Sequence, residues 1–338
     1  MVDFDAVAEN MQIAWRRDNI STQENGTQNG VKRPWIVPPP VWQETVWRGV
    51  REGLLTYLDR TGVQKHKGVH NLKSSWVLCA NLYFPFRQGS GPSLLAGFLQ
   101  RHVSSEIRRV ERVELEYAEP APRDPQTLLG EPDTGTRGAN QTSPDVAFLV
   151  ETDRGPGLIL TENKFTEHHF YGCSGRKPEV QNPDPGRCLA WSRLRADITA
   201  GCWQHHWATD TRPNRKYWSH LRLSEHGRTA LTRCPAASDG YQLFRQQALA
   251  EALAATTTYA LVASCVAYDE RNTALRHCLR RTGVDDFTTG WGPLFTGRAT
   301  FATWSHQDWV NWVRQQDTNG QWGDWLAYVQ TRYGYGKR

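Results

Sequence analysis

Two apolar runs separated by a turn sequence constrain the fold of this 338-residue chain most. The runs are Val146–Val150 and Leu158–Leu160, and Asp153–Gly157, which contains Gly-Pro-Gly, lies between them. This pattern predicts a β-hairpin with one strand over Asp145–Glu151 and a return strand over Leu158–Lys164. Because a strand without polar alternation is buried on both faces, we expect the hairpin in the centre of a sheet.

Charged residues end both predicted strands. A turn centred near Gly155 brings Asp145 opposite Lys164, and side-chain alternation places Glu162 on the same face as Lys164 while Asn163 points away. Two carboxylates are hard oxygen ligands for Mg²⁺ or Mn²⁺, which can activate water for attack on a phosphodiester, and Lys164 can orient or activate that water. The alternative is an exposed hairpin with a surface ion pair of little energetic value. Charges that end a buried hairpin favour the functional reading.

The order of elements around the hairpin is an independent indication of the fold. Apolar residues at helical spacing predict a helix over Ser93–His102, and alternation predicts a strand over Ile107–Tyr117. After a long insertion, Tyr241–Ala255 reads as a helix and Tyr259–Tyr268 as a strand rich in β-branched and small residues. The sum is an α/β fold whose core runs αβββαβ.

These residues resemble the PD-(D/E)XK nuclease superfamily, whose signature is matched by Pro144-Asp145 and by Glu162-Asn163-Lys164. Leu129-Gly130-Glu131, residues 137–143 and Tyr241–Arg245 are similar to its bacterial restriction-endonuclease-like branch, and the likeness covers roughly residues 70 to 335. The resemblance implies the restriction-endonuclease-like αβββαβ core with a mixed central sheet, and Mg²⁺ dependence. It does not establish a substrate.

Further site residues are predicted from the same regions. Glu131, in a polar loop before the Asp145 strand, is a candidate for the further acid that members of the superfamily place near the metal, and Glu116 at the end of the first strand competes for that role. Gln242 and Arg245, one turn apart on the predicted helix, can reach the site or a phosphate. The alternative is a helix whose polar face meets solvent.

The insertion over residues 165–240 carries a second chemical signal. Cys173, Cys188, Cys202 and Cys234 all lie within it and can supply four thiolates for structural Zn²⁺ or an iron–sulfur cluster. The spacing is wide and lacks a Cys-x-x-Cys pair, and four histidines multiply the ligand sets: His168, His169, His205 and His206. The alternative is small buried side chains or free thiols. A metal would explain how an insertion without regular apolar periodicity stays folded.

Composition and charge bound the partners and the compartment. A net charge of +5 and a pI near 8.8 permit contact with a polyanion, and the scattered charges do not demand it. Seven cysteines and an acidic N-terminus without an apolar signal segment indicate a cytoplasmic protein whose cysteines are reduced thiols or metal ligands. No segment is long and apolar enough to predict a membrane span. Because double-strand cleavage often uses two active sites, the sequence also allows a homodimer.

The chain divides into residues 1–40, a short helical segment with a mobile polar linker, and residues 41–338, the nuclease domain with two leading helices over Val41–Leu58 and Leu72–Phe84. We therefore expect a Mg²⁺-dependent endonuclease that hydrolyses DNA, in a setting of bacterial restriction or phage defence. The alternatives are a nuclease acting on RNA or damaged DNA, and a nucleic-acid-binding module with a degenerate site.

Overall fold

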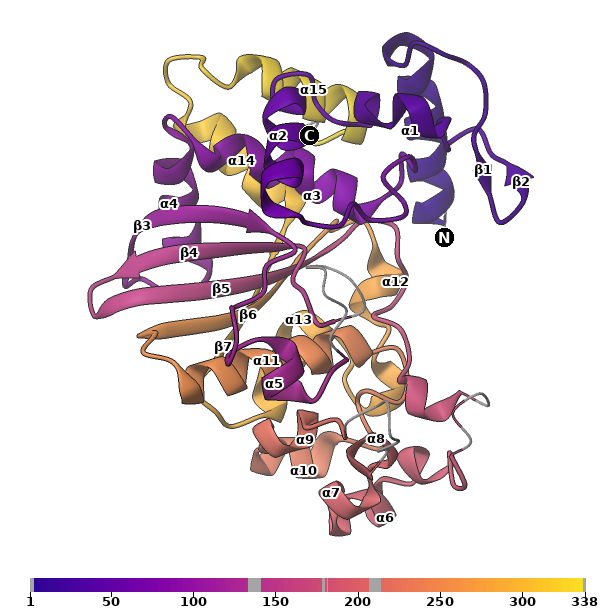
Figure 1. The fold of residues 1–338 in the computed structure, drawn as a ribbon, viewed down its shortest axis with the longest axis vertical. Coiled ribbons are helices and arrows are strands. Elements are labelled where there is room, and N and C mark those ends of the chain that lie inside the picture. Colours follow the sequence, from indigo (N-terminus) through magenta and orange to yellow (C-terminus); the bar gives the residue numbers. More distant parts are fainter. Residues whose placement is uncertain (1–2, 133–140, 178–179, 181, 207–213, 337–338) are drawn as a thin grey trace.

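A five-stranded mixed sheet forms the centre of the molecule (Figure 1). The computed structural model describes residues 3–132, 141–177, 180, 182–206 and 214–336. The strand order is β3-β4-β5-β6-β7, with β3 antiparallel to β4, β4 antiparallel to β5, and β5, β6 and β7 parallel. The strands are β3 (Ile107–Leu115), β4 (Val146–Thr152), β5 (Gly155–Lys164), β6 (Leu261–Tyr268) and β7 (Thr300–Ser305). The four expected strands are present, and β7 is an edge strand that the sequence did not indicate.

The hairpin of β4 and β5 is buried as expected, but its register differs from the prediction. Thr152 pairs with Gly155 and Val146 with Thr161, so the turn is the two-residue link Asp153-Arg154. Continuing this register places Asp145 opposite Glu162 rather than opposite Lys164. The prediction was wrong by two residues because Gly155 and Pro156 belong to the strand and not to the turn. A shift of two residues leaves every side chain on its expected face.

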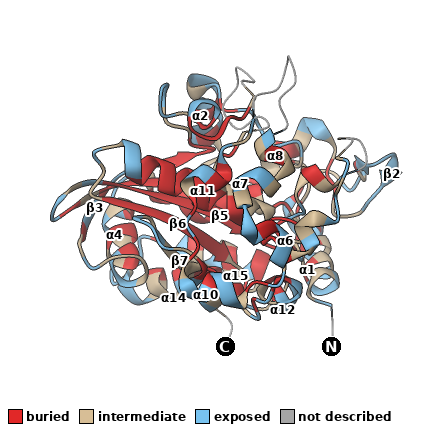
Figure 2. Cartoon of the chain, turned by 90° about the horizontal axis from the view of Figure 1, so that it is seen from below, coloured by how far each residue is buried: buried red, intermediate tan, exposed pale blue. Residues whose placement is uncertain are grey.

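Helices cover both faces of the sheet, so the strands alternate between two cores (Figure 1). Val146, Phe148 and Ile159 belong to one core, and Ala147, Leu149, Leu158 and Leu160 to the other. Figure 2 shows the resulting band of buried residues along the sheet. The first face is covered by α2 (Arg51–Thr61), α3 (Ser75–Tyr83), α4 (Gly91–His102), α14 (His306–Gln316) and α15 (Gly323–Tyr333). The second is covered by α5 (Pro125–Leu129), α11 (Tyr241–Thr256), α12 (Thr273–Arg276), α13 (Phe287–Gly290) and the insertion.

The N-terminal segment packs on the C-terminal helix. Helix α1 (Phe4–Asn19) contacts α15, and buried Gln12 and Arg332 exchange two hydrogen bonds. The polar stretch that follows was expected as a mobile linker. Instead it encloses the Arg16 guanidinium, which donates to Asn25 Oδ1 at 3.0 Å and to the carbonyl oxygen of Ile36 at 3.2 Å. A buried cation needs such acceptors, and they order the chain around it.

The two helices expected next are shorter than predicted. In place of one helix over Val41–Leu58, a 3₁₀ helix (Pro39–Thr45) is followed by α2, because the chain between them is extended at Val46. Helix α3 begins at Ser75, where the Ser74 hydroxyl accepts the Val77 N–H as an N-cap. Every residue from Trp76 to Tyr83 is buried. Within the described parts of the chain, no helix combines the length and the apolarity needed to cross a membrane.

The insertion between β5 and α11 folds from short pieces. Its described helices are α6 (Trp191–Ala196), α7 (Ile198–Gly201), α8 (Trp203–His206), α9 (Tyr217–His220) and α10 (Glu225–Ala230). The longest of these has six residues. Helices this short are not stable alone, so the insertion depends on tertiary contacts.

Candidate active site

Asp145, Glu162 and Lys164 lie on the face of the sheet that packs against α11. Side chains alternate along β5, so Glu162 and Lys164 lie on the same face as Leu158 and Leu160. The two leucines belong to the second core, which includes α11. Asn163 points to the opposite face, where its amide donates to the Ser75 carbonyl at 2.8 Å. The structure therefore brings together the three charged groups that the sequence singled out.

Lys164 and Glu162 are in direct contact, and the backbone between them holds Asp145. The Asn163 backbone N–H donates to Asp145 Oδ2 at 2.7 Å. Lys164 Nζ donates to Glu162 Oε1 at 2.7 Å and to Gln242 Oε1 at 2.9 Å, and Gln242 Nε2 donates to the same Glu162 oxygen at 2.9 Å. Gln242 of α11 thus closes a triangle with the lysine and the glutamate. The side chain of Lys164 is only 3% exposed, so this geometry is fixed.

The electrostatics of the site favour a cation. Burial and the neighbouring Glu162 carboxylate raise the pKa of Asp145 well above its ordinary value, although Lys164 and the Asn163 N–H oppose the shift. Burial works against the charge of Lys164, but Glu162, Glu167 and Asp145 outweigh it and raise the lysine pKa. Lys164 is therefore an ammonium at neutral pH. Three acids face one ammonium, and a divalent ion would offset the excess negative charge.

Two residues of this site were not predicted. Glu167, three residues past Lys164, lies near enough to affect the pKa of both Lys164 and Asp145, and its Oε2 accepts the Phe165 N–H at 2.8 Å. Exposed His66, from the loop before α3, lies within electrostatic reach of Glu167, Lys164 and Glu162. An acid just beyond the motif was a sequence signal that could have indicated Glu167. His66 is about a hundred residues away in the chain, and no local pattern points to it.

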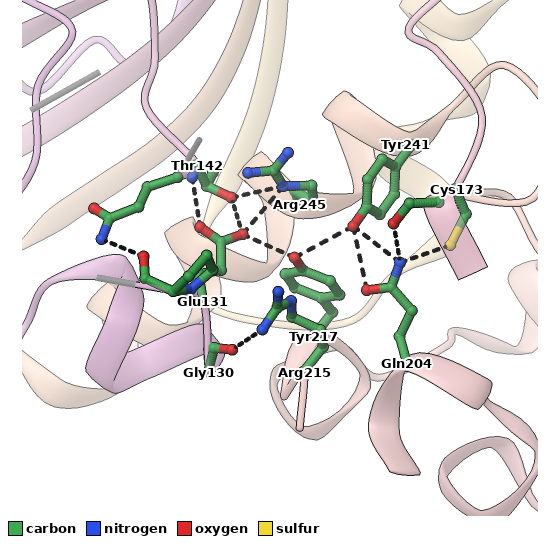
Figure 3. Close-up of polar contacts among 12 residues, drawn as sticks. Gly130, Glu131, Thr142, Cys173, Gln204, Arg215, Tyr217, Tyr241 and Arg245 are labelled. Atoms are coloured by element: carbon green, nitrogen blue, oxygen red, sulfur yellow. Dashed lines mark hydrogen bonds and ion pairs between the residues drawn. The ribbon is translucent and has the colours of Figure 1, made fainter. Parts of the chain in front are cut away.

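Glu131 is held in a different set of contacts (Figure 3). Its Oε2 accepts the Thr142 N–H at 2.5 Å, and its Oε1 accepts the Thr142 hydroxyl at 2.6 Å, the Tyr217 hydroxyl at 2.8 Å and Arg245 Nε at 3.1 Å. Four donors therefore occupy this 1%-exposed carboxylate. Arg245 Nε donates to Glu131 and to the Thr142 hydroxyl, so it belongs to this Glu131 cluster. The role of Glu131 as a further metal-binding acid stays a prediction. Its contacts indicate that it holds Thr142, Tyr217 and Arg245 in place.

The two clusters border one small cleft. Its volume is about 50 Å³, and its walls include Glu162, Gln242, Thr142 and Arg245. Glu116, the competing acid, lies beside Asp145, since its N–H donates to the Asp145 carbonyl oxygen at 3.2 Å. Of the motif stretch 137–143, residues 137–140 lie outside the described residues.

The four cysteines of the insertion come together around one cavity beside the first turn of α11. Cys173, Cys188, Cys202 and Cys234 all line it. As the side chains stand, no group of three or more His, Cys, Asp or Glu in the described parts of the chain has a geometry that could hold a metal ion. None of the four histidines that were considered as ligands lines the cavity.

One protein family matches almost the whole length of this chain. The profile of the family described as Restriction Endonuclease associating with ARP matches residues 9–334. The chain belongs to this family. No protein with curated function and no solved structure matches it. Membership makes the protein restriction-endonuclease-like and suggests a nuclease with a DNA substrate.

Proposed function

We propose that this protein is a divalent-metal-dependent endonuclease that hydrolyses DNA phosphodiester bonds through Asp145, Glu162 and Lys164, in restriction or phage defence. The observation that carries the proposal is the convergence of two carboxylates and a buried ammonium at the end of the central hairpin, beside α11. The αβββαβ order of elements supports assignment to the PD-(D/E)XK superfamily.

The residues fit a hard divalent cation such as Mg²⁺ or Mn²⁺. Among the described residues, Asp145 uses only Oδ2 and Glu162 only Oε1 in hydrogen bonds, so each retains one oxygen for an ion. Two carboxylates with the remaining positions left to water and substrate are a usual set for Mg²⁺. When bound, the ion supplies Lewis-acid stabilisation of negative charge on the phosphate.

The protein's own groups have distinct tasks in this proposal. The Asn163 N–H orients Asp145. Lys164, held between Glu162 and Gln242, presents a fixed positive charge and N–H donors to a phosphate oxygen or to the attacking water. Its hydrogen bonds to Glu162 and Gln242 direct the ammonium, so Lys164 acts as a hydrogen-bond donor in this proposal.

Cleavage of supercoiled plasmid with Mg²⁺, Mn²⁺ or EDTA tests the proposal. Asp145→Asn and Lys164→Met preserve side-chain size, and we expect each to lower the cleavage rate by about 10²-fold or more. Asp153→Asn is the matched control, because Asp153 lies in the exposed turn at the other end of the same hairpin and pairs with Arg108. Circular dichroism checks that all variants fold.

Three outcomes separate the alternatives. Full cleavage by both site variants would reject these residues as the active site. Tight DNA binding without cleavage under any metal condition would indicate a binding module with a degenerate site. Parallel reactions with single-stranded RNA and with DNA that carries base lesions show whether the same site prefers another substrate.

A further inference from the structure

Four separate segments of the insertion deliver their thiols to one small apolar cavity. Cys173 follows β5, Cys188 lies in a 3₁₀ turn (Arg187–Leu189), Cys202 separates α7 from α8, and Cys234 follows α10. The cavity has a volume of about 20 Å³, and aromatic rings enclose it. The rings belong to Trp203, Tyr217, Trp218, Tyr241 and Phe244. The fold therefore brings together four cysteines that are far apart in the sequence.

Backbone hydrogen bonds connect the segments that carry the cysteines. The Cys234 N–H donates to the Cys188 carbonyl oxygen at 2.9 Å, and the Cys173 N–H donates to the Ala236 carbonyl oxygen at 2.8 Å. These bonds fix three of the four cysteine backbones relative to one another. The remaining cysteine, Cys202, is connected through Gln204, whose Nε2 donates to Cys173 Sγ at 3.0 Å.

N–H groups are directed at the sulfur atoms. The Gly175 N–H donates to Cys173 Sγ at 3.4 Å. The N–H groups of Gln204 and His205 face Cys202, and the Ala236 N–H faces Cys234. Donors of this kind stabilise a thiolate, which is the form of cysteine that binds a metal ion.

Burial opposes ionisation of the same thiols. The pKa of Cys173 is raised to about 12 and that of Cys202 to about 11, with burial as the largest cause. Four thiols around one cavity, with N–H donors directed at sulfur, are a favourable site for a thiophilic cation.

We propose that Cys173, Cys188, Cys202 and Cys234 bind one Zn²⁺ ion as a tetrathiolate site that cross-links the insertion. A cavity of about 20 Å³ has room for a single ion with sulfur ligands at about 2.3 Å. The thiols do not form this geometry as they stand. Binding requires rotation about their Cα–Cβ bonds, the one side-chain torsion that positions each sulfur.

The site would brace the helix that carries Gln242. Gln204 contacts Cys173 on one side and the Tyr241 hydroxyl, at 3.1 Å, on the other, and Tyr241 directly precedes Gln242 (Figure 3). Tyr241 is also 3.4 Å from the Tyr217 hydroxyl, which donates to Glu131. A metal at the cysteines therefore stabilises α11 and the Glu131 cluster. This inference does not depend on the proposed nuclease activity, because metal content and stability report on it directly.

The test is metal analysis of the full-length protein, expressed with zinc and purified without a histidine tag or chelator. We expect about one Zn²⁺ per chain by mass spectrometry. Titration of the folded wild-type protein with a mercurial should release the ion to a chromophoric chelator. Protein loaded with Co²⁺ should show thiolate-to-cobalt charge-transfer absorption.

Serine variants assign the ligands. Cys173→Ser, Cys188→Ser, Cys202→Ser and Cys234→Ser should each reduce bound zinc to background and lower the Tm. Cys278→Ser is the matched control, since Cys278 is a half-buried thiol that packs on the same core without lining the cavity, and it should keep the metal. Cys202→His, which restores a zinc ligand, should recover part of the bound metal where the serine variant does not.

Three results would overturn the proposal. Wild-type protein with only trace metal, and no release on thiol titration, would show that the cysteines are packing residues. Zinc retained by all four serine variants would place it elsewhere. Bound iron together with sulfide and a visible absorption band would show that the cysteines bind an iron–sulfur cluster and not a single zinc ion.

Discussion

The Glu131–Arg245 pair gives the sharpest energetic prediction. Glu131 is 1% exposed, and it is the acidic partner of an Arg245 side chain that is 20% exposed. Replacing one partner leaves a buried charge without its counter-charge, which costs about 3–5 kcal/mol. We expect Glu131→Gln to lie near the lower end, about 3 kcal/mol, because the amide keeps one oxygen that can accept from Tyr217 or Thr142.

The double variant provides the decisive comparison. Arg245→Met alone should also cost about 3 kcal/mol, since it leaves the Glu131 carboxylate buried with neutral donors only. In Glu131→Gln/Arg245→Met no unpaired charge remains, so we expect a total near 4 kcal/mol and a coupling energy of about 2 kcal/mol. Chemical denaturation followed by tryptophan fluorescence measures all four free energies of unfolding.

An exposed pair on the same molecule is the control. Arg154 donates to Glu106 at 2.6 Å, but the arginine side chain is 63% exposed, so Glu106→Gln should change stability by no more than about 1 kcal/mol. Additive effects at Glu131 and Arg245, within about 0.5 kcal/mol, would refute the reasoning. A Glu131→Gln variant with unchanged stability that no longer gains Tm with Mg²⁺ would instead make Glu131 the further metal-binding acid.

Three further predictions follow from single residues. Burial lowers the pKa of His306 to about 4, although Asp269, Glu167 and its 2.9 Å contact with the Lys164 carbonyl favour the proton. Because the unfolded imidazole takes up a proton below about pH 6.5 and the folded one does not, stability is lost as pH falls. The wild type should lose about 2 kcal/mol more than His306→Gln between pH 7.5 and pH 5, and equal losses would place the titration elsewhere. Arg332 is fully buried and donates to Gln12 Oε1 at 2.9 Å and to the Tyr328 hydroxyl at 2.6 Å, so Arg332→Met should lower the free energy of unfolding by about 3 kcal/mol in urea titrations. Gly130 has φ +66°, and a Cβ there would clash with the Asn214 carbonyl oxygen, so Gly130→Ala should cost about 2 kcal/mol or more, against little change for Gly53→Ala, where a Cβ meets no atom.

Much of the fold was predictable because it depends on local pattern. Continuous apolar runs over Val146–Val150 and Leu158–Leu160 identified buried central strands, and helical spacing identified α11. The faces of Asp145, Glu162 and Lys164 followed from alternation alone, which is why the two-residue error in register did not move them. The edge strand β7 was not indicated, because its half-exposed residues give no continuous apolar run.

The site itself was only partly predictable. Proximity of Asp145 to Glu162 is a property of one hairpin, so the chain between them determines it. The contact of Gln242 with Lys164 depends instead on the packing of α11 against β5, two elements that the insertion separates in the sequence. His66 comes from the loop before α3, about a hundred residues before the motif. No periodicity encodes such distances, because they are set by how layers pack.

The sequence by itself determined which groups end the central strands, since side-chain direction along a strand is fixed by the backbone. Tertiary structure alone decided what those groups meet. Neighbouring carboxylates hold Lys164 as an ammonium despite its burial, and four donors occupy the Glu131 carboxylate. Four distant cysteines share one cavity for the same reason, because contacts between segments far apart in the chain arise only when the core forms.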